Sequence, residues 1–105
     1  MGIEIFWLGF AEAKLKDIYD YYSLNANKKV ARKLISGVVT TTLKIENNPK
    51  IGPLEVRLSH RSERFRFLIF KHYKIIYFIN EDFKRAEIVH VFDIRQDPIK
   101  INQEI

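Results

Sequence analysis

Three arginines and a lysine in the second half of the chain are the side chains best suited to chemistry on a phosphate: Arg64, Arg66, Lys74 and Arg95. An arginine can bind a phosphate through two parallel hydrogen bonds, and a cluster of cations can stabilise a pentavalent transition state without a metal. The first three lie in the most hydrophobic stretch of the sequence, RFRFLIFKHYKIIYFI (64–79). The plain alternative is solvated charge on an exposed sheet face. The four residues act together only if the surrounding elements bring them to one surface.

The positive charge of the chain is concentrated around these residues. The formal net charge of the 105 residues is +5. Between Lys50 and Lys74, seven lysines and arginines stand against two glutamates, whereas the remainder has eleven of each sign. Such clustering is typical of a surface that meets a polyanion or an acidic protein segment.

The composition excludes several other kinds of site. The chain has no cysteine, which rules out disulfides and cysteine-based zinc sites and fits a reducing cytoplasm. The acidic residues lack metal-ligand spacing and there is no glycine-rich phosphate loop, so we expect no metal and no cofactor. No stretch reaches the roughly 18 apolar residues of a membrane span, and the first residues lack a basic leader. These features predict one cytoplasmic domain over residues 1–105.

The hydrophobic periodicity predicts the element order β-α-α-β-β-β. A β-rich run at 3–8 precedes helical spacing up to the break at 25–27, and a second helix runs from there to Asn47-Asn48-Pro49. A loop at 49–63 leads to the hydrophobic stretch, and residues 86–94 form the last strand. The predicted fold is therefore α+β, with a two-helix hairpin packed on a small, mainly antiparallel sheet of about four strands.

The length of the turn within 64–79 decides which side chains share a face. A two-residue turn at Lys71-His72 would pair Phe70 with Tyr73 and leave both faces half charged. A three-residue turn would pair Ile69 with Tyr73 and collect only uncharged side chains on one face. Since burying an unpaired cation is costly, we predict the three-residue turn.

This register places Arg64, Arg66 and Lys74 on the face opposite the helices. In the last strand, one alternating set consists of Ile88, His90, Phe92 and Ile94. If that set is core, Arg95 joins the three other cations on the basic face. His90 is then predicted to be a core histidine with an internal hydrogen bond.

Four segments in this order resemble the RelE/ParE superfamily of type II toxins, often called plasmid stabilisation proteins: KDIYDYY (16–22), ENNPKIG (46–52), FRFLIFKHYKIIYFI (65–79) and VFDIRQDP (91–98). The resemblance implies a small α+β toxin that is neutralised by an antitoxin encoded beside it. It also implies that the antitoxin covers the basic surface of the toxin with an acidic C-terminal segment, and that operator DNA is bound only through the antitoxin.

Two toxic activities occur among proteins of this kind. RelE-like members cut mRNA on the ribosome without a metal, and ParE-like members inhibit DNA gyrase by binding. For a RelE-like enzyme, the resemblance implies that Arg66 and Lys74 hold the scissile phosphate, that Arg95 stabilises the pentavalent charge, and that Arg64 is a further hairpin cation.

The end of the chain departs from the RelE-like pattern. No tyrosine follows Tyr77 and no histidine follows His90, so the usual C-terminal acid or base is missing. We therefore place ParE-like inhibition of gyrase ahead of mRNA cleavage by a metal-independent endoribonuclease. The alternative from a different class is a non-toxic module that binds an antitoxin or RNA.

Overall fold

The computed structural model describes residues 2–105 and confirms the predicted α+β order β-α-α-β-β-β. Two short 3-10 turns and a C-terminal helix, which the sequence pattern did not predict, are added to it. The elements are β1 (Glu4–Trp7), α1 (Gly9–Asn25), α2 (Lys28–Thr42), η1 (Leu43–Ile45), η2 (Val56–Leu58), β2 (Arg66–Phe70), β3 (Tyr73–Asn80), β4 (Arg85–Asp93) and α3 (Ile99–Glu104).

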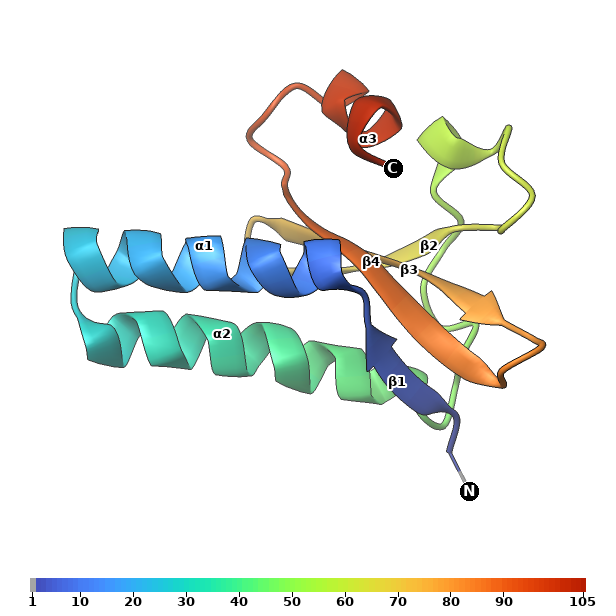
Figure 1. Ribbon diagram of the computed structural model, residues 1–105, viewed down its shortest axis with the longest axis horizontal. Coiled ribbons are helices and arrows are strands. Elements are labelled where there is room, and N and C mark those ends of the chain that lie inside the picture. Colours follow the sequence, from blue (N-terminus) through green and yellow to red (C-terminus); the bar gives the residue numbers. More distant parts are fainter. Residues whose placement is uncertain (1) are drawn as a thin grey trace.

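The four strands form one mixed sheet in the order β1-β4-β3-β2. β1 runs parallel to β4, and the other neighbours are antiparallel. Figure 1 shows α1 and α2 side by side as a hairpin, with α3 near η2 and apart from both long helices. None of the helices over residues 2–105 has the length and apolar character of a membrane span.

α2 keeps its helical form through a β-branched run that has poor helix propensity. Asn27 caps its first turn by accepting a hydrogen bond from the Val30 amide at 2.8 Å. Near its end, the hydroxyl of Thr41 donates to the Gly37 carbonyl at 2.8 Å. Val38 is fully buried in the core below α2, so tertiary packing outweighs the local preference.

The turn between β2 and β3 has two residues, not three. Phe70 pairs with Tyr73, and Lys71-His72 form the turn, with Lys71 in the left-handed region at φ 52°. The predicted register is therefore wrong. It assumed that only one face of the sheet is covered, whereas Leu68 packs toward the helices and Phe67 packs on the opposite face, against a second core.

A β-bulge in β4 divides the last strand between these two cores. Ile76 pairs with His90 but Tyr77 pairs with Ile88, which leaves Val89 as the extra residue. Ile88 and Val91 consequently belong to the core under α1 and α2, while Val89 and Phe92 belong to the second core. The prediction that Ile88 and Phe92 share a face is wrong, because alternation does not continue through a bulge.

The second core lies under the C-terminal end of the chain. It contains Leu58 of η2, Phe65, Ile76, Phe92 and Ile101 of α3, all buried. α3 and η2 thus cover the face of the sheet that the helical hairpin leaves open. This cover explains why both faces of the β2–β3 hairpin tolerate large apolar side chains.

Candidate functional site

The four predicted cations do not form one cluster. Arg66 is opposite Tyr77 at the open end of the β2–β3 hairpin, and Arg64 precedes it. Lys74 lies near the turn, opposite Phe92. Arg95 follows β4 at the turn end, where the Ile94 amide donates to the His72 carbonyl at 2.9 Å. The prediction of a shared basic face is wrong, because it depended on the three-residue turn and on an unbroken β4.

Arg66 holds the 49–53 loop against β2. Its Nη1 donates to the Gly52 carbonyl at 2.7 Å and lies 3.4 Å from the Lys50 carbonyl. The hydroxyl of Tyr77 assists by donating to the Pro49 carbonyl at 2.8 Å and accepting from the Gly52 amide at 3.0 Å. Burial raises the pKa of Tyr77, so this hydroxyl keeps its proton. Arg66 is thereby engaged with backbone carbonyls of its own chain.

Lys74 is neutralised by a carboxylate buried on the second face of the sheet. Its Nζ lies 2.6 Å from Oε1 of Glu55, whose side chain is only 2% exposed, against 19% for Lys74. The ammonium also lies 4.3 Å from the centre of the Phe67 ring, at cation–π distance. The other carboxylate oxygen of Glu55 accepts from the Arg57 amide at 3.1 Å. The three-residue turn was predicted because a lysine on a covered face would be an unpaired buried cation. Glu55 neutralises Lys74, so this cost does not arise.

Arg95 forms a two-point ion pair with Asp93. Its Nε lies 3.0 Å from Oδ1 and its Nη2 lies 2.7 Å from Oδ2, while the Arg95 side chain stays 63% exposed. The hydrogen bond from Arg95 holds the pKa of Asp93 below its usual value. The pair borders a cavity of about 430 Å³ between α1, the end of β4 and α3, which Tyr22 and Tyr73 also line.

Arg64 is the predicted site residue with the greatest freedom to meet a partner. It is exposed and lies in the left-handed region at φ 55°. Within residues 2–105 it makes no ion pair. It borders a hollow of about 560 Å³ together with Lys50, Arg66 and the acidic Glu81 and Asp82. The mixed charge of this hollow does not favour phosphate.

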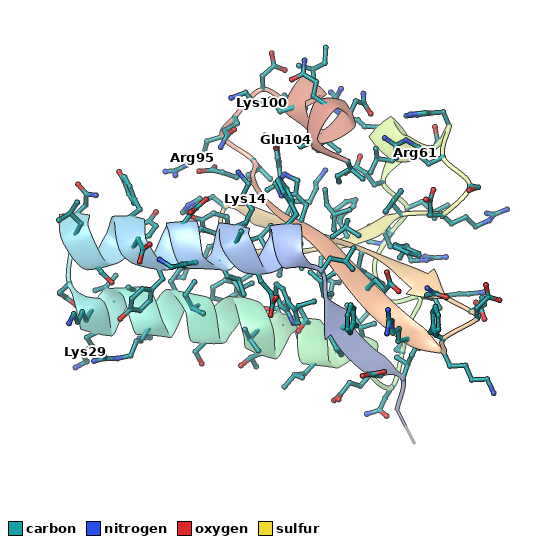
Figure 2. All side chains as sticks on the ribbon, in the orientation of Figure 1. Lys14, Lys29, Arg61, Arg95, Lys100 and Glu104 are labelled. Atoms are coloured by element: carbon teal, nitrogen blue, oxygen red, sulfur yellow. The ribbon has the colours of Figure 1, made fainter. Side chains whose placement is uncertain are left out.

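His90 is a core histidine, as predicted. It is buried, its ring meets Phe10 and Phe92 edge to face, and its Nε2 lies 2.7 Å from Oε1 of Glu104 in α3. Burial lowers the pKa of His90, so the neutral ring donates from Nε2 to the carboxylate. Figure 2 places Glu104 on α3. Among residues 2–105, no three His, Asp or Glu side chains gather as metal ligands do.

A groove between α2 and the β2–β3 turn was missed by the sequence argument. It measures about 740 Å³ and is bordered by Lys33, Lys44 and Lys71. A signal was present: from Lys28 to Lys44 the chain has five cations, and no acidic residue occurs between Asp20 and Glu46. Outside 50–74 the numbers of basic and acidic residues are equal, and this balance concealed the local excess of positive charge in α2.

The sequence matches the family "ParE toxin of type II toxin-antitoxin system, parDE" over residues 5–98. The solved chromosomal ParDE TA system from P. aeruginosa has a similar fold, with a TM-score of 0.72 at 18% identity over 88% of this chain and 96% of that chain. The comparison with curated proteins found no match. Because the family match includes nearly the whole chain, the protein belongs to the ParE toxin family of type II toxin–antitoxin systems.

Proposed function

We propose that this toxin inhibits DNA gyrase by binding it and that a cognate antitoxin neutralises it. The observation that carries the proposal is the dispersion of the four candidate cations. A metal-independent nuclease needs its cations arranged around one scissile phosphate. Here Arg66 binds the carbonyls of a loop, Lys74 is paired with Glu55, and Arg95 is paired with Asp93.

The lack of an available general acid or base also favours gyrase inhibition over mRNA cleavage. Such a group must come within hydrogen-bond reach of the proton that it transfers. His90 is buried and donates to Glu104, and the chain after β4 has neither a histidine nor a tyrosine. Inhibition by binding needs no proton transfer. Operator DNA, in this proposal, is contacted only by the antitoxin.

Purified protein tested in two assays distinguishes the activities. We expect it to abolish negative supercoiling by gyrase in a dose-dependent manner and to leave mRNA intact in a translation extract. Addition of the protein encoded by the adjacent gene should restore supercoiling. Cleaved mRNA with unaffected gyrase would assign the nuclease activity instead, and Arg66→Ala and Arg95→Ala would then be the variants to examine. Normal growth after induction in cells would contradict both toxic activities.

A further inference from the structure

The loop from residue 56 to residue 64 carries positive charge that is not compensated within the fold. It contains Arg57, Arg61 and Arg64 against a single acid, Glu63. Within residues 2–105, none of the three arginines forms an ion pair. Local folding therefore does not account for this charge, and a partner with negative charge would.

This loop is held in one shape by contacts at its ends and in its interior. The Glu55 amide donates to the Phe65 carbonyl at 2.7 Å, so the two ends of the loop meet. Between them, Leu58 is buried in the second core. A loop fixed in this way presents its side chains without a further ordering cost, which favours binding.

A second hollow next to Arg64, of about 360 Å³, is lined by this loop. Four apolar residues line it, of which Leu54 and Val56 remain 45% and 77% exposed. Arg61 and Arg64 border the same hollow, together with the carboxylate of Glu55. That carboxylate is already neutralised by its buried ion pair. The charge available to a partner in this hollow is therefore positive, and it lies beside exposed apolar surface.

Arg64 holds a backbone conformation that an arginine does not favour. Its φ of 55° lies in the left-handed region, where glycine and asparagine are the residues usually found. Lys71 and Lys84, which also have positive φ, lie in the turns between adjacent strands, where such a conformation is usual. Arg64 lies in no turn of that kind. Because strained residues are concentrated at functional sites, the position indicates a role for the Arg64 side chain outside the chain itself.

The combination of free arginines with exposed apolar side chains favours a protein partner over nucleic acid. Arginine is enriched at the positions that dominate the energy of protein interfaces, next to apolar side chains that lose water on binding. Nucleic acid would bind the arginines through its phosphates but would leave Val56 in water. A complementary surface therefore presents carboxylates to Arg61 and Arg64 and an apolar side chain to Val56.

We propose that the hollow bordered by Leu54, Val56, Arg61 and Arg64 is the surface through which the toxin contacts gyrase, by way of an acidic segment of gyrase that also carries an apolar residue. The inference rests on the proposed function, because it takes gyrase as the target. Figure 2 shows Arg61 on the loop beside α3, away from α1 and α2. Gyrase would thus meet the toxin on the face of the sheet that the helical hairpin does not cover.

The dissociation constant of the complex between toxin and gyrase, measured with and without DNA, tests this surface. We expect Arg61→Glu combined with Arg64→Asn to raise it about tenfold or more in both conditions, because two cations are lost and one charge is reversed. Asparagine accepts the left-handed backbone at position 64, so this substitution does not strain the fold. Val56→Asp should weaken binding to a similar extent, because it places a carboxylate against the acidic segment. The toxin concentration that halves supercoiling should rise by the same factor.

Arg32→Glu and Leu24→Asp are the matched controls. Arg32 is exposed on α2, Leu24 is 86% exposed near the end of α1, and neither borders the hollow. Both variants should bind gyrase as the parent does. Circular dichroism of every variant establishes that the fold is retained before binding is measured.

The remaining outcomes separate this surface from the proposed function. Loop variants that bind and inhibit gyrase like the parent would overturn the surface while leaving gyrase inhibition intact. Weakening that occurs only when DNA is present would show that the arginines contact DNA, and would overturn the protein contact. A parent toxin that neither binds nor inhibits gyrase would overturn both the surface and the proposed function.

Discussion

Lys74 and Glu55 form a largely buried ion pair on the face of the sheet that carries the second core. Glu55→Gln preserves the shape of the side chain and its contact with the Arg57 amide, but leaves the Lys74 ammonium without its counter-charge. Because removing one partner of a buried pair leaves an uncompensated charge, we expect a loss of about 3 kcal/mol in unfolding free energy. Urea denaturation at neutral pH measures this loss.

The exposed pair of Lys16 and Asp20 is the matched control for this change. Their Nζ and Oδ2 atoms are also close, at 2.7 Å, but both side chains are largely in solvent. Asp20→Asn should leave the urea midpoint almost unchanged, because water replaces the lost partner. Equal losses for the two variants would show that burial does not set the strength of the Glu55–Lys74 pair.

At the scale of elements, α3 depends on contacts with the sheet. Six residues are too few for a helix that is stable by itself, so its attachment comes from buried Ile101 and from the bond between His90 and Glu104. Burial lowers the pKa of His90 from its ordinary 6.5, so the unfolded chain binds a proton in acid that the folded chain does not. Stability present at pH 7 is therefore lost as the pH falls through 6.5.

His90→Gln should remove this pH dependence while keeping a donor for Glu104. We expect the parent to lose stability relative to the variant by up to about 1.4 kcal/mol per pH unit below pH 6.5. Thermal unfolding followed between about pH 7.5 and 5.5 gives this slope. His60→Gln, in an exposed loop, should keep the parental slope. An unchanged slope in His90→Gln would show that the acid sensitivity does not arise at His90.

Element order could be read from the sequence because each long element has its own periodicity. The hairpin register could not be read in this way. It depends on Glu55, which lies 19 residues from Lys74 in the sequence and provides the negative charge that neutralises the Lys74 ammonium. The bulge at Val89 could not be predicted either, because the residues around it are mostly apolar and the sequence pattern does not change at the bulge. The role of Arg66 depends on carbonyls of the 49–53 loop, and backbone acceptors are not distinguished by residue type. The residues of the candidate site therefore stay a prediction, whereas the prediction that they share one face was wrong.

At the scale of the whole molecule, the two cores share the same strands. Neighbouring residues of β3 alternate between them, with Ile75 under the helices and Ile76 under α3 and η2. Neither core can lose its packing without releasing β3, so the chain should unfold as one domain in a single two-state transition. The single tryptophan, Trp7, packs against the first core and reports on it alone.

Glu55→Gln provides the means to test this coupling, because Glu55 and Lys74 lie on the side of the second core. If the cores unfold together, the substitution should lower the urea midpoint seen by Trp7 fluorescence as much as the midpoint seen by far-ultraviolet circular dichroism. If Trp7 keeps the parental midpoint while the dichroism signal shifts, the cores unfold separately and α3 with η2 forms an independent layer.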